Sequence, residues 1–303
     1  MEKNFKKNSL YADIALLIVA ILWGAGFIAV KDSLDFITPF YQMAMRFTLS
    51  TIIMYIIFHK RVNKVTRVQL KNGFIIGIFL FLGFALQTVG IKYTSAGKSA
   101  FLTAVYVVLV PFLQWMLSKK KPDNYSLIGA VICIIGISML TLQDGVSIGY
   151  GDTLTLLCAF GFAGQILTIS KFVKDDDPII LTVVQMGTAA LLSISTAIFF
   201  EPFPTSMNLQ GIGSIIYLAI FSTTIAFLIQ NVAQKYTSST HTAIILSLES
   251  LFGALFSVLL LNEIFTFSML VGCVFILVAI IITETKLSFL RKSSTKEKKN
   301  ISL

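Results

Sequence analysis

Ten apolar stretches, most of them about 20 residues long, run through this chain and leave little room for a soluble domain. A transmembrane helix needs roughly 20 consecutive apolar residues to cross the hydrocarbon core of a bilayer. The connections are short and carry the Gly, Pro and Asp residues typical of turns. The sequence therefore predicts an all-α integral membrane protein of ten transmembrane helices, over residues 10–31, 36–58, 72–92, 95–118, 124–143, 152–173, 178–200, 209–234, 237–261 and 265–285.

The composition agrees with a chain that lies in lipid. Hydrophobic residues make up 56% of the 303 residues and charged residues only 13%, about half the roughly 25% of a soluble domain. The first apolar run is longer than the apolar core of a cleaved signal peptide. We therefore expect it to remain in the membrane as the first helix.

Charged residues are distributed unevenly between alternate loops. If both termini are cytoplasmic, most of the 24 Lys and Arg residues lie on that side, including the run Lys119-Lys120-Lys121. The opposite loops carry acids such as Asp32 and Glu263. This is the positive-inside bias, and it predicts a multi-pass protein of the cell (plasma) membrane with cytoplasmic N and C termini. The net charge of +9 then reports topology, so we expect no nucleic-acid partner.

The chain also resembles itself at a fixed offset. The segment KYTSAGKSA at residues 92–100 returns as KYTSSTHTA at residues 235–243, which is 143 residues later. The same shift pairs Phe84 with Phe227, and Gln87 with Gln230. A shared polar run inside apolar sequence is difficult to attribute to chance, so we infer an internal duplication.

The duplication predicts the domain organisation. Residues 1–146 form a first five-helix repeat, residues 147–285 form a second repeat, and residues 286–303 form a basic cytoplasmic tail. Because five is odd, the second repeat must enter the membrane in the opposite orientation. Inverted repeats are typical of secondary transporters, which hold substrate near the midplane between the halves and expose it alternately to each side.

Several short motifs resemble those of the drug/metabolite transporter superfamily, and specifically its EamA-type ten-helix members. The resemblance covers residues 11–285, and its motifs are Trp23-Gly24, Arg46-Phe47, Phe101-Leu102-Thr103, Tyr106 to Pro111, Gly151-Asp152, Leu248-Glu249-Ser250 and Asn262-Glu263. The family commonly has Leu-Glu-Pro and Gly-Glu where Ser250 and Asn262 stand here, so the ninth helix lacks the proline that would kink it. The resemblance implies a transporter, mostly an exporter, of small polar metabolites such as amino acids. It implies no enzymatic activity and no cofactor.

Glu249 is the sharpest candidate for the transport chemistry. It lies at the centre of the predicted helix over residues 237–261, where a charge costs roughly 2.5–3.5 kcal/mol by insertion scales. Burial there favours the neutral acid, which suits proton coupling or a counter-charge for an amine. The alternative is a structural role, in which Glu249 forms hydrogen bonds to a neighbouring helix. The repeat maps Tyr106 onto Glu249, so we expect both to face one cavity, with Tyr106 either contacting substrate or packing.

Polar side chains in the other apolar runs are further candidates for the lining of this cavity. Uncharged amides and hydroxyls suit polar solutes, although each is also common as a bond between helices worth about 0.6 kcal/mol. They are Gln87, Gln165, Gln230, Asn231, Ser99, Thr103 and Trp23.

Three basic residues are candidates either for transport or for a structural role. Arg46, within the second helix, either binds a substrate carboxylate bidentately or ties helices together, and the resemblance favours the structural role because it places this helix towards the periphery. If Arg46 paired with Glu249, it would hold the glutamate ionised and weaken proton coupling. Lys98 and His241 are repeat partners near opposite membrane faces, so they are candidate gates, or interfacial anchors, the role we favour for Lys98.

Other classes of function find less support. Cys133, Cys158 and Cys273 lie inside apolar runs and the two histidines are far apart, so no metal site is expected. Gly149-Tyr150-Gly151-Asp152 matches the short motif of intramembrane aspartyl proteases, whose chemistry needs two carboxylates that share a water. Only Glu249 lies mid-membrane, and Asp152 is better interpreted as a helix N-cap. A lipid-flipping or receptor-like protein of the same fold is a further alternative. The expected partners are a small-molecule substrate, the lipid bilayer and protons, as a monomer or a homodimer.

Overall fold

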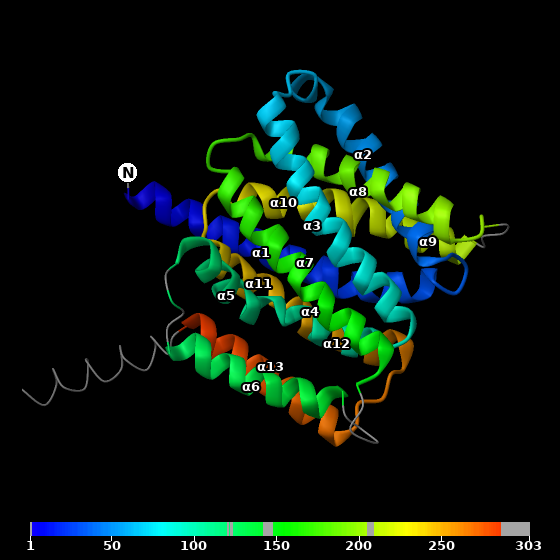
Figure 1. The fold of residues 1–303 in the computed structure, drawn as a ribbon, viewed down its shortest axis with the longest axis vertical. Helices are drawn as coiled ribbons and strands as arrows, with labels where there is room; N and C mark the ends of the chain where they lie inside the picture. Colours follow the sequence, from blue (N-terminus) through cyan, green and yellow to red (C-terminus); the bar gives the residue numbers. More distant parts are fainter. Residues whose placement is uncertain (1, 120, 122–123, 142–147, 205–208, 286–303) are drawn as a thin grey trace, which may run out of the picture.

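A computed structural model of the chain describes residues 2–119, 121, 124–141, 148–204 and 209–285. Throughout these residues the regular structure is helical (Figure 1). The elements are α1 (Glu2–Ser33), α2 (Pro39–Val62), α3 (Arg67–Lys92), α4 (Ala96–Ala104), α5 (Tyr106–Ser118), α6 (Asn124–Thr141), α7 (Tyr150–Phe172), α8 (Pro178–Phe200), α9 (Leu209–Tyr217), the π-helix η1 (Leu218–Ile225), α10 (Ala226–Ala233), α11 (Ser239–Ser247), α12 (Glu249–Leu261) and α13 (Phe267–Thr285).

The fourteen described elements form only ten helical rods, because three of the rods are interrupted and each of these comprises two or three elements. One rod combines α4 with α5, one combines α9, η1 and α10, and one combines α11 with α12. Among the described residues, eight rods are long and apolar enough to cross a membrane, and two carry shorter apolar cores at Leu127–Met139 and Phe267–Ile282. The ten predicted helices are therefore present.

The interruptions of two rods are equivalent positions of the repeat. Val105 separates α4 from α5 with φ −56° and ψ −20°, and Leu248 separates α11 from α12 with φ −61° and ψ −14°. The second break forms without a proline. There the hydroxyls of Ser247 and Ser250 donate to the carbonyls of Ile244 and Ser247 at 2.6 and 2.7 Å, and such back-bonding bends helices.

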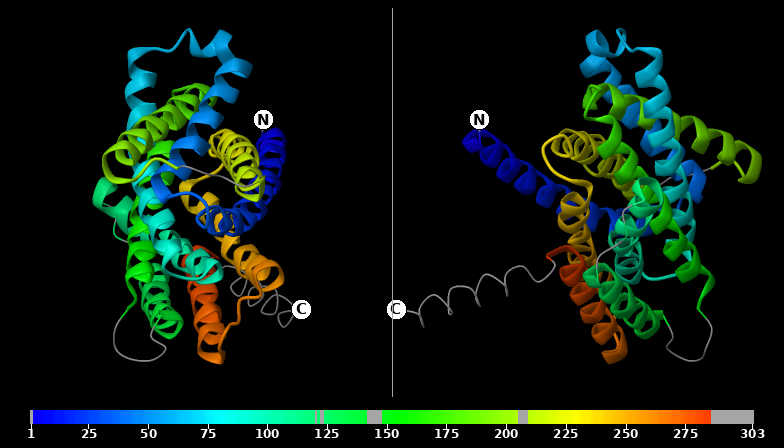
Figure 2. Two further views of the ribbon diagram at one scale, coloured as in Figure 1. Left: turned by 90° about the vertical axis from the view of Figure 1, so that its right-hand side faces the viewer. Right: turned by 60° about the vertical axis from the view of Figure 1, so that its left-hand side comes forward.

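The packing of the rods also follows the repeat. Helix α6 packs along α13 as a separate pair, which both views of Figure 2 place at one end of the molecule. Helix α2 packs along α8, α3 along α7 and α8, and α1 along α10 and α12. The rods α4–α5 and α11–α12 are thereby surrounded by helices of both halves, and their breaks lie in the interior.

Glycine lets α3 and α7 approach each other closely. A Cβ atom at Gly161 would lie 2.5 Å from the backbone nitrogen of Gly83 and 2.6 Å from its Cα. Because these neighbours are backbone atoms, no side-chain movement could relieve the overlap. The contact holds α7 against α3, and α7 carries the buried polar residue Gln165 one turn further along.

We expect Gly161→Ala to separate α3 from α7 and to lower the melting temperature of the purified protein by several degrees, since overpacking typically costs about 1–3 kcal/mol. Gly213→Ala is the matched control, because a Cβ atom there would have no neighbour within 4 Å. Equal melting temperatures for the two variants would contradict the close approach.

Candidate functional site

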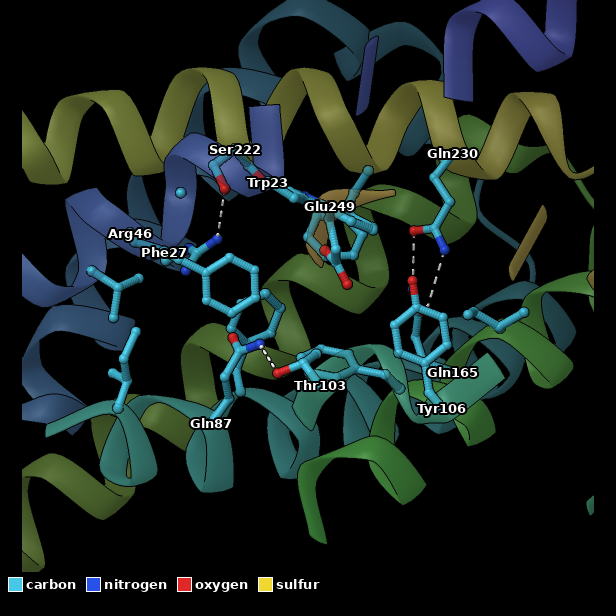
Figure 3. A pocket seen from close by; sticks show the side chains of 17 residues that line it. Trp23, Phe27, Arg46, Gln87, Thr103, Tyr106, Gln165, Ser222, Gln230 and Glu249 are labelled. Carbon is cyan, nitrogen blue, oxygen red and sulfur yellow. Dashed lines mark hydrogen bonds between the residues drawn. The ribbon is translucent and has the colours of Figure 1, made fainter. Parts of the chain in front are cut away.

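A cavity lies between the two halves and receives side chains from both of them (Figure 3). Its cavity volume is about 40 Å³, well below the usual range for small-molecule sites, so the two halves are nearly closed around it. The lining residues come from α1, α2, α3, α4, α5, α7, η1, α10 and α12, and they are Trp23, Gly26, Phe27, Val30, Arg46, Phe84, Gln87, Ile91, Thr103, Tyr106, Phe162, Gln165, Ile166, Ser222, Phe227, Gln230 and Glu249.

Tyr106 and Glu249 each follow directly after one of the two helix breaks. Tyr106 is the first residue of α5 and Glu249 is the first residue of α12. They are 2% and 4% exposed, and both line the cavity. The Tyr106 hydroxyl lies near Glu249 and interacts with it electrostatically, but it has no partner at a good hydrogen-bond geometry. The structure thus brings together the two residues that the repeat pairs.

The amides of the lining bond to neighbours within the cavity wall. Gln165 and Gln230 exchange hydrogen bonds, Nε2 of each donating to Oε1 of the other at 3.3 and 3.4 Å. Gln87 Nε2 donates to Thr103 Oγ1 at 3.0 Å. Trp23 Nε1 donates to the Ser222 carbonyl at 2.9 Å, so its ring is fixed at the wall. Amides that are paired with one another can exchange those bonds for bonds to a polar ligand.

Arg46 also faces this cavity, although the family resemblance favoured a peripheral position for its helix. Its Nε donates to Thr223 Oγ1 at 2.7 Å and its Nη2 to Ser222 Oγ at 3.3 Å. Both hydroxyls belong to η1, where Thr224 Oγ1 donates five residues back to the Ala219 carbonyl at 2.8 Å. π-Helical segments are frequent at functional sites.

Phenylalanine rings complete the lining, and the sequence alone did not assign them to the site. Phe84 packs edge-on against Phe162 and Phe227, with ring centroids 5.1 and 6.0 Å apart, and Trp23 lies 5.0 Å from Phe227. One signal was available, because Phe84 and Phe227 are a pair in the repeat. Ser222 and Thr223 carried no comparable signal.

Other candidates lie away from the cavity. Asn231 Nδ2 instead donates to Thr182 Oγ1 at 2.8 Å, towards α8. Ser99 is fully buried but does not line the cavity. The side chain of His241 lies outside the described residues.

A polar network joins α1, α3, α4 and α7 beside the cavity. Lys98 Nζ pairs with Asp152 Oδ2 at 2.8 Å, and Thr94 Oγ1 donates to Asp152 Oδ1 at 2.6 Å. Lys31 Nζ donates to the carbonyls of Ile91 and Thr94 at 2.8 and 2.6 Å. Asp152 thus lies in the first turn of α7 rather than at its N-cap, which is Gly149, and Lys98 is held in an ion pair rather than as a free interfacial anchor.

Carboxylates of the second half cap two helices of the first. Glu263 accepts the backbone N–H groups of Ala96 and Gly97 at 2.6 and 3.0 Å, at the start of α4. Glu201 accepts those of Phe40 and Tyr41 at the start of α2. In the described part of the chain, no three His, Cys, Asp or Glu side chains are grouped as a metal site.

Comparisons with known proteins agree with this architecture. The model of the EamA-like transporter family matches residues 10–142 and again residues 149–285. A protein of Archaeoglobus fulgidus named an uncharacterized transporter is 36% identical over 277 residues, which cover 91% of this chain and 87% of the relative. The uncharacterized transporter YyaM of Bacillus subtilis is 26% identical, covering 95% and 98%. A protein of known crystal structure shares the fold, with a TM-score of 0.70 at 16% identity, covering 92% and 98%.

We expect Lys98→Met to destabilise the protein by about 3–5 kcal/mol, because it leaves Asp152 charged and buried without a cation. The side chains of this pair are only 15% and 6% exposed. Melting temperatures of the variants measure the effect.

Arg61→Met is the matched control. Arg61 pairs with Asp177 at 3.3 Å, but the side chains are 58% and 30% exposed, so the loss should stay below about 1 kcal/mol. Adding Asp152→Asn to Lys98→Met should recover part of the stability. Equal destabilisation by Lys98→Met and Arg61→Met would contradict the buried ion pair.

Proposed function

Because this chain belongs to the EamA-like transporter family, we propose that it is a secondary carrier that exports small polar metabolites, such as amino acids, across the cell membrane by alternating access. Membership in a transporter family rather than an enzyme family also removes the protease interpretation of Gly149 to Asp152. The observation that carries the proposal is the cavity between the halves, with the buried carboxyl group of Glu249 in its wall.

The proposed topology has inverted halves and both termini in the cytoplasm. Its support is the positive-inside bias of the sequence and the equivalence of the breaks at Val105 and Leu248. In this topology residues 1–146 and 147–285 are the two repeats, and residues 286–303 are a cytoplasmic tail. In such carriers substrate lies near the midplane, where irregular backbone is tolerated because it lines a cavity.

We further propose that Glu249 couples transport to protons. A carboxyl group in a dry cavity is more stable neutral than charged, so it releases its proton when the cavity opens to water or when a cationic group binds beside it. The other ionisable groups around it are Tyr106 on α5, Arg46 on α2 and Cys158 on α7. Among the described residues no cation forms an ion pair with Glu249, so none holds it permanently ionised.

We expect Glu249→Gln to abolish proton coupling while the protein stays folded. Proteoliposomes loaded with the pH-sensitive dye pyranine would be exposed to the proteinogenic amino acids one at a time, and counterflow of labelled compound would report carrier activity separately. The wild-type protein should acidify or alkalise the lumen with at least one compound. Glu249→Gln should retain counterflow of that compound without a pH change.

Glu201→Gln is the matched control, since Glu201 caps α2 and lies outside the cavity. A pH change of wild-type size in Glu249→Gln would refute coupling through this residue. No counterflow of any small metabolite by the wild-type protein would refute the carrier itself.

A further inference from the structure

The Arg46 guanidinium is a buried cation whose bonding is incomplete. The residue is 1% exposed, and it lines the cavity from α2. Its Nε and Nη2 groups are bonded to Thr223 and Ser222, whereas Nη1 has no hydrogen-bond partner. Among the side chains that the structure describes, no carboxylate lies within ion-pair distance of it.

Aromatic contacts compensate the charge only in part. The Arg46 Cζ atom lies 4.4 Å from the ring centroid of Phe84 and 5.4 Å from that of Phe47. Each cation–π contact contributes about 0.5–2 kcal/mol, but the effective penalty for burying an ion is several kcal/mol. A purely structural tie between helices is better made by a neutral side chain. A bound anion would offset the part of this burial cost that the aromatic contacts leave uncompensated.

Arg46 lies in the same cavity as Glu249. Figure 3 shows Arg46 and Ser222 towards one end, Gln165 and Gln230 towards the other, and Glu249 between them. The two ionisable groups do not pair with each other. The cavity therefore presents a fixed cation and, separately, a carboxyl group, with the rings of Phe84 and Trp23 nearby.

We propose that Arg46 forms a carboxylate-binding subsite, and that the substrates are small zwitterions whose carboxylate binds Arg46 while their ammonium group faces Glu249. This inference rests on the proposed carrier function and narrows its substrate class. The planar guanidinium matches a carboxylate in two parallel hydrogen bonds. The η1 hydroxyls of Ser222 and Thr223 hold the fork in place, so they are positioning residues.

The test compares each proteinogenic amino acid with its own carboxamide, which keeps the ammonium group and side chain but lacks the carboxylate. Thermal stabilisation of the purified protein would be titrated with both members of each pair. The wild-type protein should bind at least one amino acid at least tenfold more tightly than its amide. Arg46→Gln should weaken the binding of that amino acid at least tenfold, equivalent to about 1.4 kcal/mol. It should also remove the preference for the amino acid over its amide.

Arg46→Lys keeps the charge without the planar fork, so its preference should be intermediate, and it serves if the glutamine variant fails to fold. Arg61→Gln, at an exposed position, is the matched control and should bind as the wild-type protein does. The subsite is overturned if no amino acid is preferred over its amide, or if the preference survives in both Arg46 variants. Counterflow of neutral or purely cationic compounds with no such preference would overturn the subsite and leave the carrier intact.

Discussion

Lipid offers no hydrogen-bonding partner to a polypeptide backbone, so a helix can be interrupted in a membrane only where protein surrounds the break. Three rods of this protein are interrupted, at Val105, at Leu248 and along η1. All three interruptions adjoin the same cavity, through Tyr106, Glu249 and Ser222. The cavity and the breaks therefore depend on each other. The packed halves shield the irregular backbone from lipid, and the irregular backbone places polar side chains in the cavity wall.

The same dependence explains how the charged groups are held. Arg46 needs hydroxyl partners that an ordinary helix would bond to its own carbonyls, and η1 provides them in Ser222 and Thr223. Glu249 begins α12, so its carboxyl group projects from a helix start into the cavity rather than into lipid. Beside the cavity, Lys98 and Asp152 are both largely buried and neutralise each other. Each charge in the interior is thus tied to a local feature of the backbone or to an opposite charge.

Much of this arrangement follows from the sequence, and the exceptions have physical causes. Hydropathy along the chain locates all ten rods. The repeat pairs Tyr106 with Glu249, because equivalent positions of the two halves meet at the cavity. The break at Leu248 has no proline, and the π-helical turn has no sequence signature, so neither was predictable. The position of Arg46 depends on which face of α2 meets η1, a tertiary contact between residues 177 positions apart. Asn231 is a buried amide like Gln230, but it donates to Thr182 of α8 and does not line the cavity, and this contact between helices is not visible in the sequence.

The caps supplied by Glu201 and Glu263 have a consequence for how the protein is made. Helices α2 and α4 belong to the first half, yet their exposed N–H groups are satisfied by carboxylates that are synthesised 161 and 167 residues later. During translation the first half therefore enters the bilayer with these two helix starts uncapped. Both caps can form only after residues 201 and 263 have been synthesised, so the first half depends on the second for its final hydrogen bonds.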